Sequence, residues 1–419
     1  MKILLFCGQF RPLPEGGAEK EAALQAAEFA RQGHEATVLT PRWSRAFPAE
    51  EVADGFRIVR IGRLAPLLPL AWRLHALCTG HPSEPPVHAV DGVAGLAPVA
   101  KRRAMNIPER IAWRSLARDV ERFAARERFD VVHVHGESFP WIRLGMLAAR
   151  RWGVPVFAMP VSYPLFVTGY GKSALLAEAA RTPWALRFIA LTDAIRDALV
   201  SDGVPAERIS VVPNGTPWPV RRAAGVGKTA VLVANLTQGA CWKGFDVALR
   251  AWPEVIRRVP DARLRFIGGG DPSEWRACAQ RLGIAGAVEF AGYVEGTDAM
   301  YPDDVALFVL PSRREGLSMA VVEAAARGIP AVVTDIPSFR SVVPPEAGVR
   351  VPVDDAHALA DAVAALLADE PRRRALGEAA RKRAGERYAI QSVCGRLADL
   401  YRRESDVSRR LAATFATPP

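Results

Sequence analysis

Two glutamates eight residues apart, Glu315 and Glu323, have the setting in this chain that most favours chemistry. Glu323 lies between the apolar triplets 320–322 and 324–326, so a helix here offers its carboxylate almost no polar face. An unpaired buried carboxylate is costly unless it is hydrogen-bonded, and a ligand rich in hydroxyl groups could supply those bonds. The alternative is an ordinary, partly exposed helix glutamate.

Glu315 precedes this predicted helix, and Gly316 directly after it lets the backbone approach a bound group closely. The first N–H groups of a helix have no intrahelical partner and point toward an anion that lies beyond them. Two carboxylates beside a helix N-terminus therefore suit a sugar that carries phosphate. For Glu315 the alternative is a solvated loop glutamate.

Lys243 lies beside Gly244, before a predicted helix and after a strand that ends near Asn235. Its compact ammonium group could neutralise a diphosphate, whose charge grows as it departs as a leaving group. Surface lysines are common, so the argument depends on where Lys243 lies. It stands at the start of the second half of the chain, as Gly16 does in the first half.

In the first half, two glycines begin a predicted helix and two histidines lie at the end of a predicted strand. Gly16 and Gly17 open a helical pattern, where paired glycines let backbone amides approach an anion, although a plain tight turn has the same pattern. His133 and His135 end a predicted strand, whose alternation places both on one face. The imidazole of His135 could donate to a sugar hydroxyl or a leaving phosphate, and a structural role at the strand end is the alternative.

Two glycine-rich stretches resemble nucleotide-binding motifs but do not have the residue spacing of those motifs. Residues 225–229 end in Gly-Lys-Thr, but Arg222 occupies the place of the first glycine of a phosphate-binding loop and a strand follows. Residues 268–271 follow a strand, but Ser273 stands where a dinucleotide fingerprint has its third glycine. The chain also contains no Asp-x-Asp triplet for a divalent metal. We therefore expect no metal and no cofactor, with charge neutralised by Lys243, helix ends and neutral donors.

The composition fits a two-domain protein of 419 residues. Its 55 basic and 45 acidic residues leave a net charge of +10, which favours an anionic partner but does not require nucleic acid. Basic residues are densest from 101 to 151, a face that could rest on anionic lipid headgroups or be solvated. Five widely spaced cysteines and a first apolar run too short for a signal peptide predict a cytoplasmic protein, at most peripheral at the inner face of the membrane.

Short apolar runs alternate with helical patterns in both halves, which is typical of parallel sheets covered on both faces. The predicted strands are 3–7, 36–39, 56–61, 131–134, 156–159, 188–191, 209–212, 230–234, 264–267, 288–290, 305–310 and 331–334. Between the halves, the three prolines and the Asn-Gly of residues 212–220 predict a stiff turn. Ligands of such sheets bind beyond the strand carboxyl ends, so two facing domains would form a cleft for two substrates.

Together these stretches resemble the retaining nucleotide-sugar glycosyltransferases of family four, which have the GT-B architecture of two facing Rossmann-like domains. The resemblance covers nearly the whole chain and is most specific in the second half. It rests there on the glutamate pair and on the motifs at 266–272, 288–294, 310–316 and 326–330. In the first half, residues 211–215 match the family's interdomain turn and residues 16–19 its glycine loop.

The resemblance implies roles for the residues named above. Glu315 would contact the transferring sugar, Glu323 the ribose hydroxyls, and His135 matches the family's histidine near the donor sugar. The implied catalytic residues are His135, Lys243 and Glu315. The implied donor-binding residues are Gly16, Gly17, Asn235, Lys243, Gly316, Leu317, Ser318 and Glu323. Two positions depart from the family: Asn235 replaces the usual arginine beside the diphosphate, and Val-Ser-Tyr at 161–163 stands where an acceptor-side histidine is frequent.

The domains that we expect are 1–215, on the acceptor side, and 216–385, which would bind the nucleotide sugar. A helical pattern that is interrupted at Tyr388 predicts a last helix over 386–404 that packs back on the first domain. Residues 405–419 are expected to form a flexible tail.

The resemblance implies a retaining, metal-independent hexosyltransferase that moves a sugar from a UDP- or GDP-sugar to a hydroxyl acceptor. The acceptor would be a glycan, a lipid-linked sugar or a small molecule, in polysaccharide, glycolipid or other glycoconjugate biosynthesis. No strong enzymic nucleophile is needed if the leaving diphosphate takes the acceptor's proton. The alternatives are a sugar-nucleotide epimerase of the same architecture and a sugar-nucleotide-binding protein without catalysis.

Overall fold

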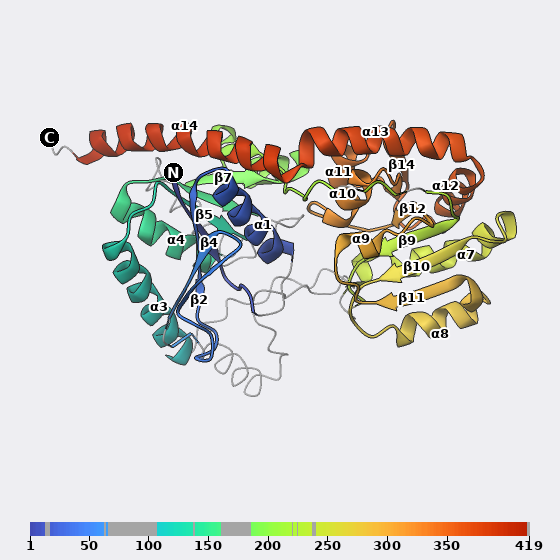
Figure 1. Ribbon diagram of the computed structural model, residues 1–419, viewed down its shortest axis with the longest axis horizontal. Helices are drawn as coiled ribbons and strands as arrows, with labels where there is room; N and C mark the ends of the chain where they lie inside the picture. Colours follow the sequence, from blue (N-terminus) through green and yellow to red (C-terminus); the bar gives the residue numbers. More distant parts are fainter. Residues whose placement is uncertain are drawn as a thin grey trace. The chain divides into compact units, whose positions relative to one another are not determined.

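The computed structural model describes residues 1–12, 17–62, 64–65, 107–136, 139–160, 186–219, 221–223, 225–236 and 240–416. Within these residues the chain forms two compact units (Figure 1). Of the described residues, those up to 215 and those from 393 onward belong to unit 1, and those between 216 and 392 belong to unit 2. Among the described residues, the chain passes from one unit to the other after residue 215 and again after residue 392.

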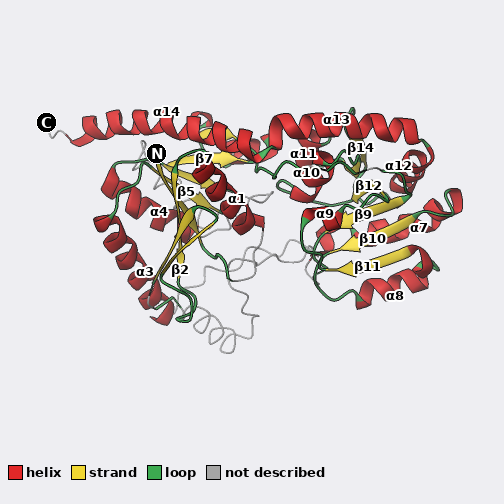
Figure 2. Cartoon of the chain, in the orientation of Figure 1, coloured by secondary structure: helices red, strands yellow, loops and turns green. Residues whose placement is uncertain are grey.

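Unit 1 is built on an eight-stranded sheet in its described part, with helices packed around it (Figure 2). Its strands are β1 (Lys2–Cys7), β2 (Glu35–Pro41), β3 (Glu50–Ala53), β4 (Phe56–Ile61), β5 (Val131–His135), β6 (Val156–Met159), β7 (Leu186–Ala190) and β8 (Ile209–Val211). They lie in the order β3-β4-β2-β1-β5-β6-β7-β8. The helices are α1 (Gly17–Arg31), α3 (Ile107–Arg126), α4 (Phe139–Trp152), α6 (Asp193–Ser201) and most of α14 (Ile390–Ala416).

Every strand pair in this sheet is parallel except β3 with β4. Strand β3 was not predicted, because its Glu-Glu-Val-Ala segment is polar and lies at the sheet edge. The sequence does carry a signal for this hairpin, the Asp54-Gly55 pair. In the structure both residues have positive φ, at 52° and 82°. An Asp-Gly pair with two positive φ values is the typical two-residue hairpin connection.

Unit 2 is built on a six-stranded, fully parallel sheet in its described part. Its strands are β9 (Thr229–Val233), β10 (Arg263–Ile267), β11 (Val288–Gly292), β12 (Val305–Leu310), β13 (Ala331–Thr334) and β14 (Gly348–Val351). They lie in the order β11-β10-β9-β12-β13-β14. The helices are α7 (Phe245–Arg258), α8 (Ser273–Arg281), α9 (Thr297–Met300), α10 (Met319–Ala326), α11 (Pro337–Val342), α12 (Ala356–Ala368) and α13 (Glu370–Tyr388).

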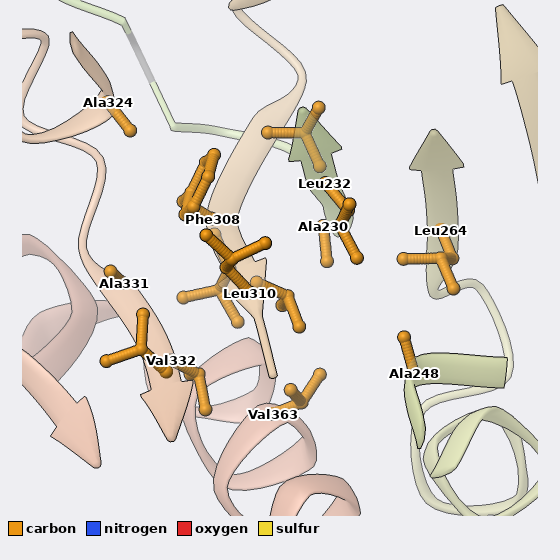
Figure 3. Close-up of a cluster of buried hydrophobic side chains, with 14 of the residues drawn as sticks. Ala230, Leu232, Ala248, Leu264, Phe308, Leu310, Ala324, Ala331, Val332 and Val363 are labelled. Carbon is orange, nitrogen blue, oxygen red and sulfur yellow. The ribbon is translucent and has the colours of Figure 1, made fainter. Parts of the chain in front are cut away.

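The core of unit 2 lies between the central strands and the helices that cover them. All six residues of β12 are buried, as expected for a strand covered on both faces. Figure 3 shows Phe308 and Leu310 of β12 among side chains of the neighbouring strands, with Val363 of α12 beside them. Burying each such apolar side chain stabilises the fold by roughly 1.5–3 kcal/mol, so this core fixes the strand ends that carry the site.

Helices α13 and α14 form the C-terminal pattern that the sequence predicts. They are separated at Ala389, whose φ of −59° and ψ of 127° are extended rather than helical. Within α14, the buried Tyr401 packs against Phe29 and Phe157 of unit 1, with ring centroids 5.9 and 5.0 Å apart. The prediction of two α/β domains with a helix returning to the first is confirmed. The helix continues to residue 416, through residues that we expected to form a tail, and Ser408 in this part is buried.

Candidate functional site

The loops that follow β9 and β12 meet at one edge of the unit 2 sheet, because these strands are parallel neighbours. Lys243 follows β9 and Glu315 follows β12. Lys243 Nζ lies 2.7 Å from Glu315 Oε1, although 72 positions separate the two residues in the sequence. The structure thus brings together two of the three residues that we singled out as catalytic.

Hydroxyl groups hold Glu315 in place. Ser312 Oγ donates a hydrogen bond to Glu315 Oε1 at 2.8 Å, and Ser338 Oγ of α11 donates to the Glu315 carbonyl oxygen. Thr334 Oγ1, at the end of β13, donates to the Ser312 carbonyl oxygen. Glu315 is only 9% exposed, and Ser312 and Lys243 bind its carboxylate, which is largely withdrawn from water, while Ser338 and Thr334 fix the backbone of its loop. The roles of Ser338 and Thr334 were not predicted, because nothing in the sequence tells which loops meet.

A glycine permits the close packing that positions Lys243. Gly244 has a φ of +73°, and a Cβ built on it would lie 2.1 Å from the Pro311 carbonyl oxygen. The Arg313 N–H donates to the Trp242 carbonyl oxygen at 2.7 Å, which joins the same two loops a second time. Any residue other than glycine at position 244 would force these loops apart.

Arg313, beside Glu315 in sequence, is engaged with carboxylates of the protein. It donates two hydrogen bonds to Asp246, at 3.0 and 2.9 Å, and forms an ion pair with Asp354 at 2.6 Å. Burial raises the pKa of Asp246, but the hydrogen bonds and charge of Arg313 outweigh this effect, so the pKa is lowered overall. Arg313 is thus paired with two carboxylates of the protein, whereas Lys243 is paired with one, that of Glu315.

The N-terminus of α10 lies directly after Glu315. Gly316 is buried, and Ser318 is the N-cap residue, but its side chain makes no capping hydrogen bond. The first N–H groups of a helix lack intrahelical partners and attract anions. Together with Lys243, this helix end can hold a negatively charged group such as a phosphate.

Glu323, on α10, is half-buried and has a neighbour that the sequence analysis missed. The buried Tyr301 donates a hydrogen bond to the Ala320 carbonyl oxygen at 3.0 Å. Burial raises the pKa of Tyr301, and the charge of Glu323 raises it further. Glu323 is thus not a lone carboxylate in an apolar helix, because an aromatic hydroxyl lies beside it. Its exposed part can still accept hydroxyl groups of a ligand.

Asn235 is tied to the glycine-rich turn after β10. Its Oδ1 accepts a hydrogen bond from the Gly269 N–H at 3.2 Å. A Cβ on Gly268 would lie 2.0 Å from the Ala234 carbonyl oxygen, and one on Gly270 would lie 2.4 Å from that of Leu236. These glycines are therefore needed for close packing of the turn against residues 234–236. This packing accounts for the glycines, so a role in dinucleotide binding is not needed to explain them.

In unit 1, His133 and His135 lie on the same face of β5, as predicted, with ring centroids 4.3 Å apart. His133 is fully buried, and its Nδ1 lies 2.7 Å from the hydroxyl of Tyr401. His135 is 4% exposed, and neither of its ring nitrogens has a hydrogen-bond partner among the described residues. Burial lowers the pKa of His135 to about 3, so its imidazole is neutral and suited to hydrogen bonding rather than to carrying a proton at neutral pH.

Other predicted positions in unit 1 are less informative. Gly17 is the first residue of α1 and is exposed, whereas Gly16 and residues 161–163 lie outside the described residues. Of the residues predicted for unit 1, the structure thus places His135 at the end of β5 and Gly17 at the start of α1.

One cluster in the described part of the chain has the spacing of metal ligands. It comprises Glu254, His357 and Asp361, whose ligand atoms lie within 4.8 Å of one another on α7 and α12. Arg258 forms an ion pair with Asp361, and Glu254 Oε2 lies 2.8 Å from His357 Nδ1. The hydrogen bond and charge of Glu254 raise the pKa of His357. These groups already form an exposed ion-pair network on the surface of unit 2.

Comparison with known proteins points to one family. Residues 15–217 match the model of Glycosyltransferase Family 4, and residues 227–369 match that of Glycosyl transferases group 1. The chain is 28% identical to a GDP-mannose-dependent alpha-(1-6)-phosphatidylinositol monomannoside mannosyltransferase of Mycolicibacterium smegmatis, over 95% of this chain and 97% of that protein. It is 32% identical to a phosphatidyl-myo-inositol mannosyltransferase of Mycobacterium tuberculosis, over 60% of this chain and 68% of that protein.

The fold is also found in solved structures. The sucrose-phosphate synthase of Thermosynechococcus elongatus superposes with a TM-score of 0.70 at 16% identity, over 96% of this chain and 99% of that one. The likeness establishes the GT-B fold that the sequence predicted. No helix in the described residues is long and apolar enough to cross a membrane.

Proposed function

Because the chain belongs to glycosyltransferase family 4, we propose that it transfers a hexose from a nucleoside diphosphate sugar to a hydroxyl group of a glycolipid or glycan acceptor. The observation that carries this proposal is the pairing of Lys243 with Glu315 beside the N-terminus of α10. A cation and uncapped amides suit a diphosphate, and the carboxylate beside them suits the hydroxyls of the attached sugar.

In the proposed reaction the acceptor oxygen bonds to the anomeric carbon on the face from which the diphosphate leaves, so configuration is retained. The acceptor's proton passes to a diphosphate oxygen, and the enzyme need not supply a nucleophile. Lys243 and the amides of Gly316, Leu317 and Ser318 would stabilise the charge that grows on the leaving group. Glu315 would hold the sugar, and His135, being neutral, would donate a hydrogen bond to it.

The direct test is to incubate the protein with GDP- and UDP-sugars and with lipid-linked and soluble acceptors. GDP-mannose with a phosphatidylinositol-type acceptor is the first combination, since the relative from Mycolicibacterium smegmatis is GDP-mannose-dependent. A glycoside product supports the proposal. An epimerised donor would favour the epimerase alternative, and binding without any product would favour a non-catalytic role.

We further propose that turnover needs no metal, since Lys243 and helix amides can balance the diphosphate charge. Adding a chelator in excess should leave the rate unchanged within experimental error. A loss of activity that magnesium or manganese restores would contradict this prediction. A chelated sample with zinc added back serves as the control for unspecific metal effects.

We expect Glu323→Ala to weaken binding of the nucleoside diphosphate, because a carboxylate that accepts ribose hydroxyls contributes about 1.5–3 kcal/mol. This corresponds to a rise of roughly 10- to 150-fold in the dissociation constant, measured by calorimetry. Glu274→Ala, at an exposed position of α8, is the matched control and should bind as the unchanged protein does. An unchanged dissociation constant in Glu323→Ala would remove the ribose assignment.

We also propose that the protein contacts an anionic membrane through a basic face of α3. Five exposed arginines follow one another at intervals of four residues on α3: Arg110, Arg114, Arg118, Arg122 and Arg126. Like charges at this spacing repel by about 0.2–0.5 kcal/mol per pair, and an anionic surface would relieve that repulsion. If the acceptor is lipid-linked, the inner face of the membrane that holds it would provide such a surface.

Replacing Arg114 and Arg118 together by glutamine should weaken binding to vesicles that contain anionic lipid. Each basic residue near such a surface contributes about 1 kcal/mol, so a loss of roughly 10- to 30-fold is expected in sedimentation. Replacing the exposed Arg257 and Arg281 of unit 2 removes the same charge and should have a smaller effect. Equal losses in the two double variants would show that net charge, and not this face, governs binding.

A further inference from the structure

A pocket on unit 2 shares no lining residue with the pair formed by Lys243 and Glu315. Its volume is about 480 Å³, within the range of roughly 300–1,000 Å³ that small-molecule sites have. One lining residue belongs to the segment before β9 and five belong to α13. They are Trp218, Glu378, Arg381, Lys382, Gly385 and Glu386. All six are residues of unit 2, so this unit forms the pocket alone.

The lining residues of α13 share one face of the helix, because they follow one another at positions i, i+3, i+4, i+7 and i+8. Trp218 packs on this face. The guanidinium carbon of Arg381 lies 4.7 Å from the centroid of the indole ring, which is a cation–π distance. Arg381 Nη1 also donates a hydrogen bond to the Ala326 carbonyl oxygen. Arg381 is thus anchored and holds the ring of Trp218 against α13.

A glycine lets the indole reach the helix. A Cβ built on Gly385 would lie 2.9 Å from Cη2 of Trp218. Glycine is unfavourable inside a helix, so the packing of this ring gives a reason for its presence in α13. Pro217 and Pro219 flank Trp218, and their fixed φ angles restrict the backbone on both sides of it. The ring is therefore in place before any ligand binds.

Packing against α13 leaves part of the indole accessible. Trp218 is 36% exposed, whereas Trp252 of the same unit is 1% exposed. An aromatic ring that stays open to water inside a pocket offers a flat apolar surface. The pocket therefore suits a ligand that has an apolar face as well as polar groups.

The charges that line the pocket balance one another. Glu378 and Glu386 are acidic, and Arg381 and Lys382 are basic. Glu378 is also paired with Arg222, which does not line the pocket. Two charges of each sign give little net attraction for a phosphate or for a metal cation. The carboxylates can accept hydrogen bonds and the ammonium group can donate them, so the polar groups suit a neutral ligand with several hydroxyls.

We propose that this pocket binds a neutral pyranose ring of a glycan. A pyranose has an apolar C–H face, which would pack on the part of the Trp218 indole that Arg381 leaves open. Its hydroxyls lie around the edge of the ring, where they would bond to Lys382 and Glu386. The sugar would thus be held at a second site, outside the one that we assign to the donor. That this glycan is the acceptor or the product of transfer rests on the proposed function, whereas the binding itself does not.

The test follows the indole N–H signals of the full-length, ¹⁵N-labelled protein by NMR during titration with methyl α-D-mannopyranoside and methyl α-D-glucopyranoside. The signal of Trp218 is the one that disappears in Trp218→Phe. We expect it to shift with at least one of the two glycosides, with a dissociation constant on the order of 1–10 mM, as is usual for a ligand of this size. Trp275 of α8, which packs on Phe245 with ring centroids 5.4 Å apart, is the internal control and should not shift.

Two variants keep the Trp218 signal and remove the proposed hydroxyl partners. Lys382→Ala and Glu386→Ala should each raise the dissociation constant about three- to tenfold, because each loses a hydrogen bond to the sugar. Arg372→Ala is the matched control, since it removes an exposed charge of α13 ten residues before Lys382. It should leave the dissociation constant unchanged within about twofold.

The proposal is overturned if the Trp218 signal does not shift with either glycoside at concentrations up to about 100 mM, roughly ten times the weakest expected dissociation constant. A shift with inorganic phosphate but with neither glycoside would also overturn it, and would make the pocket an anion site. Unchanged affinity in both Lys382→Ala and Glu386→Ala would contradict the assigned hydroxyl contacts. The decisive titration uses the unchanged protein without a donor, so its outcome is independent of whether the protein transfers a sugar.

Discussion

Lys243→Ala should lower turnover by about two to three powers of ten while changing donor affinity much less. The leaving diphosphate gains charge as the glycosidic bond breaks, and a fixed cation stabilises that charge more than it stabilises the bound donor. The loss corresponds to about 3–4 kcal/mol, similar to the cost of removing one hydrogen-bond donor from an oxyanion hole. Lys243 Nζ is held 2.7 Å from Glu315, so the cation is already in place before the reaction. Single-turnover rates and calorimetric dissociation constants, measured separately, give the two quantities.

Lys228→Ala is the matched control, since Lys228 of the same unit pairs with the exposed Asp261. It should leave both quantities unchanged. Asn235→Arg in the Lys243→Ala background should restore part of the lost turnover if the two positions face the same phosphates. Equal losses of affinity and turnover without such rescue would mean that Lys243 only holds the ground-state donor.

Gly244→Ala should lower the free energy of unfolding by about 2–5 kcal/mol and abolish donor binding. The new Cβ would meet the Pro311 carbonyl oxygen at 2.1 Å, and alanine at a φ of +73° is strained in addition. The loops that carry Lys243 and Glu315 must then separate. Urea denaturation followed by circular dichroism gives the stability, and calorimetry gives the binding.

Gly286→Ala provides the comparison, because a Cβ there meets nothing within 4 Å and its φ lies outside the left-handed region. It should cost less than about 1 kcal/mol, as surface substitutions usually do. If Gly244→Ala were as mild as this control, the packing of the two loops would not be what positions Lys243.

The sequence predicts the strands of both units well where they are buried, because a strand covered on both faces is a continuous apolar run. The resemblance implies that Lys243 and Glu315 both act on the donor, but their direct contact follows only from the strand order, in which β9 and β12 are parallel neighbours. Strands β3 and β14 were not predicted. Each lies at the edge of its sheet; β3 is polar, and β14 is the short Gly-Val-Arg-Val segment.

The supporting side chains could not be predicted, because they depend on contacts between loops that are distant in the sequence. Ser338 binds the backbone of Glu315 across 23 positions, and Tyr301, the residue after α9, lies beside Glu323. Neither carries a local pattern that distinguishes it from any other serine or tyrosine.

The return of α14 to unit 1 has a consequence for how the protein is made. The described residues of unit 2 all lie between 216 and 392, whereas unit 1 needs Tyr401 to complete the buried cluster around His133 and Phe157. During synthesis at about 5–20 residues per second, the second half of the chain requires roughly 10–40 s after Gly215 has been added. Through that interval the first 215 residues lack a helix that buries their aromatic side chains. A fragment that ends at residue 215 should therefore aggregate, whereas residues 216–392 contain every strand of their sheet and are the part to express alone.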